Sequence, residues 1–348
     1  MTIIVSYQRK GFVLMGGDLM ISSDRERTNP IDLPTRFSKL QPDPNLFLLR
    51  LSQKVVIIDD HLAVAWAGRK NIAGYLVGRI ASGMSQPYSA EKILALIDGS
   101  GLLEEDLESV SFIFFGLIRD DQDDKMFVQD YRTGETIVGD HEKIKYAGSG
   151  ISHFLKSIAF NMKGSTGQVN TYEEFVGTFI TRLAIALYQE IVSDVTHKLF
   201  YGGGFELLLL NPIEKRFVKV PMTFVFWEYG SRGVELTGPI LTLNYDANGY
   251  LFLHRIVRTE QDKWTRKSYA VGNILSERNS DVPPSPPPDF NTFFSVHYLI
   301  STERNDKVNL LIKKGEQKNI EIRYSPESGM IDIQWTSEFI EEIKCATS

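Results

Sequence analysis

The chain has 348 residues, of which 43% are hydrophobic and 24% are charged, and its formal net charge is −6. This composition is typical of a globular protein with a sizeable core, and it offers no basic excess to attract nucleic acid or an anionic membrane. The single cysteine, Cys345, excludes an intramolecular disulfide and a zinc cluster of thiolates.

The N-terminal apolar segment is interrupted by Gln8, Arg9 and Lys10 and lacks the charged start and long apolar run of a signal peptide. No other stretch approaches the length that a membrane span requires. We therefore expect a cytoplasmic protein with no membrane partner.

Strands dominate the beginning of the chain. Residues 2–7 and 11–17 are β-rich and are separated by a short polar turn, which predicts a hairpin. Residues 22–44 are polar and broken by four prolines, which predicts a long loop. Residues 55–58 and 62–66 predict a second strand pair.

Helices follow in pairs. Helical spacing of apolar residues predicts helices just after Gly68, from Ser89, from Ser149 and over residues 172–192. The last of these is preceded by Thr171 with Glu174 three residues later, the capping-box pattern. Further strands are predicted at 110–118, 126–131, 144–147, 205–210 and 217–226. Paired helices and antiparallel strand runs predict two sheets face to face with helical layers outside.

The chain changes character near residue 220. Beyond it the helical signal nearly disappears and alternating stretches predict strands. We therefore expect one domain over residues 1–220 and a separate β-rich region over 221–348. Residues 281–289 hold five prolines and predict a stiff extended spacer.

Three blocks carry a family resemblance. The first is Thr2-Ile3-Ile4-Val5-Ser6 with Gly16-Gly17-Asp18, the second runs from Lys54 to Gly68, and the third is Gly148-Ser149-Gly150. Together they resemble a proteasome-type β subunit, closest to the bacterial proteasome-like peptidase of the heat-shock locus V type. The resemblance covers residues 2 to 220. It implies an α+β fold, the four-layer αββα sandwich of N-terminal-nucleophile (Ntn) hydrolases, with an appended β-rich C-terminal region.

The resemblance implies a catalytic role for each block. After removal of Met1, Thr2 would carry both the nucleophilic hydroxyl and an α-amine that acts as its base. Lys54 would lower the pKa of that amine, and Asp18 would hold Lys54 charged and oriented. The list of implied catalytic residues is completed by the backbone N–H of Gly68, as oxyanion donor, and by Ser149, which would assist proton transfer.

Two further positions fall where the family contacts substrate. Trp66 aligns with the base of the main specificity pocket, and Ser22 with a residue whose backbone pairs with the substrate. Structural roles are open for all these residues: Trp66 also fits a core aromatic, Ser22 a turn former, Lys54 a strand-edge lysine and Gly148–Gly150 the start of a helix.

The sequence departs from the family pattern at one place. The family has Asp-x-x-Ser-Gly-Gly near the end of its long helix, whereas this chain has Leu199 and Gly202 in place of the aspartate and the serine. Asp194 or Thr196 are alternatives if the loop is longer. The loop over residues 22–44 is an insertion relative to the family.

Two functions follow as hypotheses. The first is a threonine-type Ntn hydrolase, a threonine protease or amidohydrolase that cleaves peptide or amide bonds. The second is a catalytically inactive proteasome-like scaffold or binding module that acts through its C-terminal region. The expected partners are a peptide or protein substrate, further copies of the chain in a homo-oligomer, and an ATPase or other regulator. No cofactor is expected, and the six histidines lack metal-ligand spacing.

Overall fold

A computed structural model describes most of the chain. The described residues are 2–9, 12–23, 33–35, 47–118, 125–137, 142–162, 171–193, 201–211, 213–231, 233–246, 248–259, 263–275, 293–303, 308–314, 320–324 and 331–347. The fold is mixed α+β with several antiparallel sheets. The predicted spacer at 281–289 and most of the predicted loop at 22–44 lie outside the described residues.

The predicted N-terminal hairpin lies at the centre of a six-stranded sheet, in the order β12-β11-β2-β1-β10-β9. β1 and β2 pair antiparallel from Ile4 opposite Gly17 to Arg9 opposite Phe12, which confirms the hairpin. The strands are β1 Ile4–Arg9, β2 Phe12–Asp18, β9 Gly134–Ile137, β10 Glu142–Ala147, β11 Phe205–Asn211 and β12 Arg216–Lys219. Both faces are buried, because Val5 and Tyr7 enter one core cluster while Ile4, on the other face, enters another.

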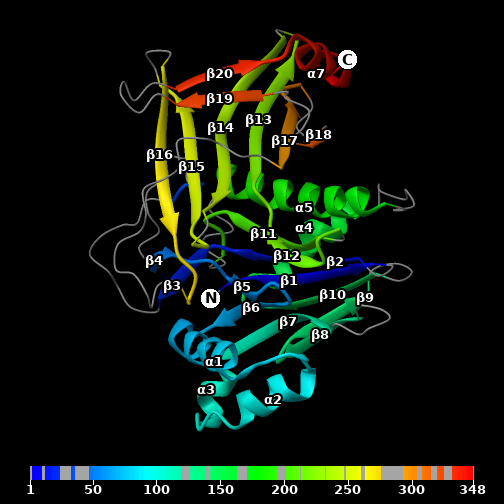
Figure 1. The fold of residues 1–348 in the computed structure, drawn as a ribbon. Helices are drawn as coiled ribbons and strands as arrows, with labels where there is room; N and C mark the ends of the chain where they lie inside the picture. The colour runs from blue at the N-terminus through cyan, green and yellow to red at the C-terminus, as the bar shows by residue number, and fades with distance from the viewer. Residues whose placement is uncertain are drawn as a thin grey trace.

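A four-stranded antiparallel sheet packs against the first. Its strands, in spatial order, are β5 Val55–Asp59, β6 Leu62–Gly68, β7 Val110–Ile118 and β8 Lys125–Tyr131. Ile4 and Met15 of the first sheet share a buried cluster with Ala65 and Phe115 of the second. The opposite face of the second sheet is covered by α1 Lys70–Gly83 and α2 Ala90–Asp98, with α3 Glu104–Glu108 beside β7 (Figure 1).

Helices α4 Ile151–Met162 and α5 Tyr172–Val192 cover the other face of the first sheet. The predicted capping box is present at the start of α5, with reciprocal Thr171 and Glu174 hydrogen bonds. The Tyr7 ring of β1 stacks on Phe175 of α5 with ring centroids 4.9 Å apart. The N-terminal hairpin and the longest helix are therefore parts of one core.

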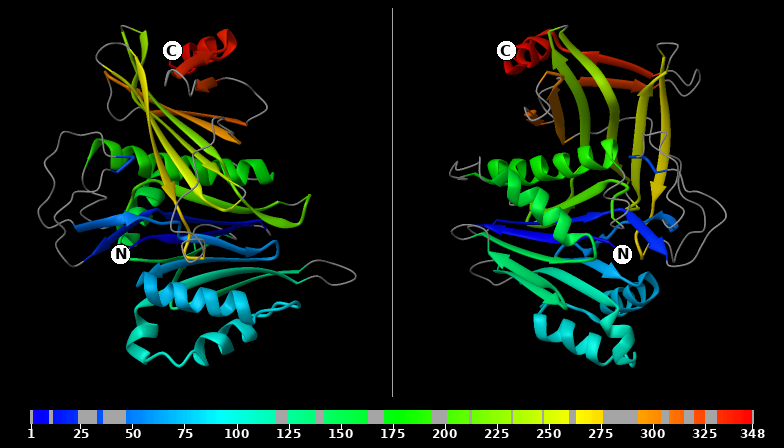
Figure 2. Two further views of the ribbon diagram at one scale, coloured as in Figure 1. Left: turned by 60° about the vertical axis from the view of Figure 1, so that its left-hand side comes forward. Right: turned by 180° about the vertical axis from the view of Figure 1, so that it is seen from behind.

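A second six-stranded sheet follows in the chain and lies over α5 (Figures 1 and 2). Its strands, in spatial order, are β16 Trp264–Val271, β15 Leu251–Arg258, β14 Gly233–Tyr245, β13 Met222–Gly230, β17 Phe294–Ser301 and β18 Val308–Lys314. All neighbours are antiparallel except β13 and β17. Tyr298 of β17 stacks on Tyr188 of α5 with centroids 4.7 Å apart. Helix α5 therefore lies on the outer face of the first sheet, as predicted, but the C-terminal sheet covers its other side, which was not predicted.

Smaller elements complete the fold. β3 Met20–Ser23 pairs with β4 Phe47–Leu51, and β19 Ile320–Tyr324 pairs with β20 Ile331–Trp335. Helix α7, Ser337–Thr347, packs on the far face of the C-terminal sheet through Phe339 and Ile343. This helix and α3 were not predicted. α3 has five residues and is too short to give a helical period, whereas the helical spacing of Phe339, Ile340 and Ile343 in α7 was a signal that sequence reasoning missed.

One predicted strand is divided in two. Residues 217–226 form parts of β12 and β13, which belong to different sheets. The break falls at Val220 and Pro221, where proline lacks the backbone N–H that a continuous ladder needs.

Helix α5 also corrects the expectation that no stretch could span a membrane. Its 21 residues are long and apolar enough by length and composition alone, but 61% of its most apolar window is buried inside the protein. That burial between two sheets is typical of a core helix.

Candidate active site

Thr2 and Asp18 are in direct contact. The Thr2 hydroxyl donates a hydrogen bond to Asp18 Oδ1, and the backbone N–H of Ile3 donates to the same oxygen at 2.9 Å. The backbone N–H of Gly202 donates to the other oxygen, Asp18 Oδ2, also at 2.9 Å. The segment just before β1, the end of β2 and the loop before β11 therefore meet at one carboxylate. Thr2 is only 1% exposed, so this site is closed to solvent.

Lys54 lies beside this pair, directly before β5. A Cβ on Gly17 would lie 2.9 Å from Lys54 Cβ, so the glycine before Asp18 is what allows the lysine to approach β2. The Lys54 ammonium lies 4.6 Å from the centre of the Trp66 ring, a cation–π distance. The structure thus brings together Thr2, Asp18 and Lys54 from two separate sequence blocks.

The charges at the site are shifted by burial. Desolvation raises the pKa of Asp18 to about 6, although the Lys54 charge and three hydrogen bonds act in the opposite direction. Desolvation also lowers the pKa of Lys54 to about 8, against the attraction of Asp18. Near neutral pH the carboxylate and the ammonium are both ionised and hold one another in a buried, low-dielectric site.

The turn over Gly148–Gly150 packs directly on Thr2. Gly148 has a φ of +113°, and a Cβ there would lie 1.7 Å from the Thr2 carbonyl oxygen, so this position requires glycine. The predicted helix begins just afterwards as α4. Ser149 itself is exposed, and no hydrogen bond links its hydroxyl to Thr2 among the described contacts. The motif is thus explained by close backbone approach, and the proton-transfer role of Ser149 stays a prediction.

The remaining predicted residues have structural contacts. Gly68 ends β6 with a φ of +101°, and a Cβ there would lie 1.9 Å from the Ser109 carbonyl oxygen. Trp66 is fully buried and donates from Nε1 to the Gln53 carbonyl at 3.1 Å. Ser22 lies in β3 opposite Leu48, so it is a strand residue and not the start of a loop. The oxyanion role of Gly68 and the substrate contacts of Trp66 and Ser22 stay predictions.

The glycine-rich loop before β11 holds Asp18 through its main chain. Gly202, the position predicted to lack a supporting serine side chain, donates its backbone N–H to Asp18. Glu190 of α5, 2% exposed, accepts hydrogen bonds from the backbone N–H of Gly203 in this loop and from the Thr35 hydroxyl. Leu199, Asp194 and Thr196 lie outside the described residues.

Sequence reasoning missed a buried polar network behind Lys54. Glu206 of β11 accepts hydrogen bonds from the backbone N–H groups of Lys54 and Val55, the latter at 2.7 Å, and pairs with the Lys219 ammonium. Glu206 is fully buried. The available signal was a glutamate inside an otherwise apolar strand, since a buried charge is retained only when it is paired.

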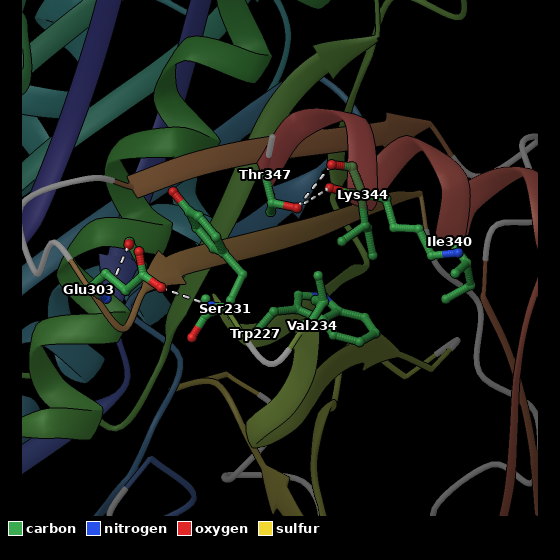
Figure 3. Close-up of a pocket in the computed structure, with 12 residues that line it drawn as sticks. Trp227, Ser231, Val234, Glu303, Ile340, Lys344 and Thr347 are labelled. Carbon is green, nitrogen blue, oxygen red and sulfur yellow. Dashed lines mark hydrogen bonds between the residues drawn. The ribbon is translucent and has the colours of Figure 1, made fainter.

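A pocket of about 680 Å³ lies in the C-terminal part of the chain, between the β13–β14 hairpin, the end of β17 and α7 (Figure 3). Trp227, Val234, Ile340 and Ile343 form much of its apolar wall. Glu303 closes one side, where it accepts a hydrogen bond from the Ser231 backbone N–H at 2.9 Å. None of the residues predicted for catalysis or substrate binding lines this pocket.

Comparison with known proteins identifies no relative of this chain. A scan against protein-family models gives no match to the chain, and a search of curated proteins gives none either.

Proposed function

We propose that the chain is a threonine-type Ntn hydrolase, with a four-layer αββα core of the proteasome type, that cleaves peptide or other amide bonds. The observation that carries the proposal is the buried contact of the Thr2 hydroxyl with Asp18 beside Lys54. The layering supports it too, since two sheets pack face to face with helices on both outer faces.

The chemistry begins when an aminopeptidase removes Met1 and frees the Thr2 α-amine. An α-amine has an ordinary pKa of about 7.7–8.0, and the Lys54 ammonium disfavours its protonation. The uncharged amine takes the hydroxyl proton as the oxygen attacks the substrate carbonyl. The leaving amine then receives that proton, and water hydrolyses the resulting ester on Thr2.

Asp18 and Lys54 serve this chemistry as a charge pair. The negative charge of Asp18 keeps Lys54 protonated despite its burial, and the positive charge of Lys54 stabilises the alkoxide that develops on Thr2. In the structure the Thr2 hydroxyl is bonded to Asp18, so the hydroxyl must leave this acceptor when it passes its proton to the amine.

The test is mass spectrometry of the purified full chain before and after treatment with a peptide epoxyketone and a β-lactone. An epoxyketone needs both the amine and the hydroxyl of a terminal threonine, whereas a β-lactone needs the hydroxyl alone. We expect Met1 to be absent and Thr2 to carry each adduct. Thr2→Ala is the control, because it keeps a small second residue for processing but has no hydroxyl.

A second function is favoured by two observations. Thr2 is almost wholly buried, and the C-terminal part holds a pocket remote from every predicted catalytic residue. These support a non-catalytic scaffold or binding module. Retention of Met1, or a free Thr2 that neither reagent labels, would favour this second function over the first. Thr2-dependent labelling with turnover of peptides would exclude it.

A further inference from the structure

The segment just before β5 is held by the C-terminal sheet. The backbone N–H of Gln53 donates to the Gly272 carbonyl at 3.0 Å, and the Ser52 hydroxyl reaches the same carbonyl at 3.5 Å. Gly272 follows directly after β16. The three residues Ser52, Gln53 and Lys54 are all at most 1% exposed. Two regions that the sequence separates by more than two hundred residues therefore meet next to Lys54.

The Gln53 side chain makes the tightest part of this contact. Its Nε2 donates to the carbonyls of Gly249 and Val271, both at 2.7 Å. Its Oε1 accepts from the Lys219 ammonium at 3.1 Å. Its backbone carbonyl accepts from Trp66 Nε1 at 3.1 Å. Because every polar group of this buried side chain is hydrogen-bonded, any other rotamer would leave buried donors and acceptors unpaired. Gln53 therefore fixes the backbone that precedes Lys54.

The same contacts define the surroundings of the Lys54 ammonium. Trp66, held by Gln53, presents its ring to the ammonium at 4.6 Å. The Lys54 backbone N–H is bonded to Glu206, which pairs with the Lys219 that also binds Gln53. The charged groups that act on Lys54 from the elements around it are Asp18 of β2, Glu206 of β11, Lys70 of α1 and Arg50 of β4.

We propose that Gln53 is a positioning residue, through which the C-terminal sheet keeps Lys54 buried and aligned beside Asp18. The part of this inference that concerns catalysis rests on the proposed function, because it assumes that Lys54 serves Thr2. The positioning of Lys54 by Gln53 is independent of that function. The C-terminal region is thereby a component of the candidate active site and not an attachment to it.

The test is the pKa of Lys54 in the full chain, measured by NMR on protein with ¹³Cε-labelled lysine and assigned with Lys54→Arg. Gln53→Met has similar length but no amide, so it removes the bonds to Gly249, Val271 and Lys219. We expect water to reach Lys54 and its pKa to rise by roughly one unit or more toward the ordinary value. Asp18 and Glu206 remain in place, so the change reports solvation and not a lost partner.

Gln129→Met is the matched control. Gln129 also donates from Nε2 to a backbone carbonyl, that of Asp130 at 2.6 Å, but it lies in β8, which β6 and β7 separate from β5. This variant should leave the Lys54 pKa unchanged. If Gln53→Met does not fold, Gln53→Asn, which keeps an amide too short to span both carbonyls, takes its place with the same expected direction.

The readout separates this inference from the proposed function, because it needs no catalysis. A folded Gln53 variant with an unchanged Lys54 pKa overturns the positioning role even if Thr2 reacts with the epoxyketone. A raised Lys54 pKa in a protein whose Thr2 does not react supports the positioning role and counts against the hydrolase. Where Thr2 does react, the alkaline limb of its labelling rate should shift to higher pH in Gln53→Met and not in Gln129→Met.

Discussion

At the scale of single residues, Asp18 and Lys54 are both charged only over a narrow range of pH. Burial moves the pKa of Asp18 up to about 6 and the pKa of Lys54 down to about 8, so both are charged only in the interval between. A buried carboxylate and a buried ammonium with perturbed pKa values are typical of functional sites, and here the carboxylate also accepts a hydrogen bond from the Thr2 hydroxyl.

Neither shift stabilises the fold. The folded pKa of Asp18 is raised above 3.8, so its contribution to the free energy of unfolding falls as pH rises from 3.8 to about 6. The folded pKa of Lys54 is lowered below 10.5, so its burial costs stability below about pH 8 and this cost is relieved as pH rises to 10.5. At neutral pH the buried charges of Asp18 and Lys54 both lower the free energy of unfolding, and such a cost fits a role in function.

The labelling rate of Thr2 should therefore depend on pH as a bell. The acid limb should lie near 6, where Asp18 loses its charge, and the alkaline limb near 8, where Lys54 loses its charge. Because the two groups interact, the two apparent pKa values describe the pair and not either residue alone.

The measurement is the rate of Thr2 labelling from pH 4 to 10, with samples quenched at intervals and analysed by mass spectrometry. Asp18→Asn should slow the reaction and remove the contribution of Asp18 to the acid limb, which then reports protonation of the Thr2 α-amine alone. A profile identical to that of the unchanged chain would contradict the role of Asp18.

At the scale of elements, two glycine-containing turns close the site through their backbones. The turn before α4 lies against the Thr2 carbonyl, and the loop before β11 donates to Asp18. The capping box of α5, the start of α2 at Ser89 and the N-terminal hairpin were all predicted, because short-range patterns specify them. The partners of these turns were not predicted, since they come from distant parts of the chain.

Gly148→Ala tests the turn before α4. A methyl group there meets the Thr2 carbonyl in addition to the cost of the positive φ, so we expect a loss of about 1–3 kcal/mol from the φ and a comparable further loss from the clash. Gly233→Ala is the control, because Gly233 has a similar φ of +110° with nothing within 4 Å of its Cβ. Urea unfolding measures both. Equal losses of the free energy of unfolding in the two variants would show that the contact of Gly148 with Thr2 does not affect stability.

At the scale of the whole molecule, the core is shared between the two halves of the chain. Tyr7 and Phe175 belong to the same buried cluster as Phe224 and Tyr298 of the C-terminal sheet. The outer face of α5 is covered by the chain itself (Figure 2). The boundary near residue 220 therefore separates two sheets but not two cores. A homo-oligomer of this chain would have to use a surface other than that face of α5.

A fragment of residues 1–220 should accordingly fail to fold cooperatively. It would expose the apolar face of α5 and lose the hydrogen bonds of Gln53 to Gly249, Val271 and Gly272. We expect weak near-UV circular dichroism, binding of a hydrophobic dye and no sharp unfolding transition, compared with the full chain. A cooperative transition with a native-like near-UV spectrum would show that the first 220 residues are an independent domain.

The sequence by itself determined the local elements and the identity of the candidate site. Periodicity, caps and turns act over a few residues, so the hairpin, the paired helices and most strands could be predicted, and Thr2, Asp18 and Lys54 could be named from their blocks. Only the tertiary structure decided what surrounds them: the backbone donor at Gly202, the buried Glu206, and the Gln53 contact to the C-terminal sheet. These contacts join residues far apart in the chain, and their geometry depends on how sheets pack, which no local pattern records.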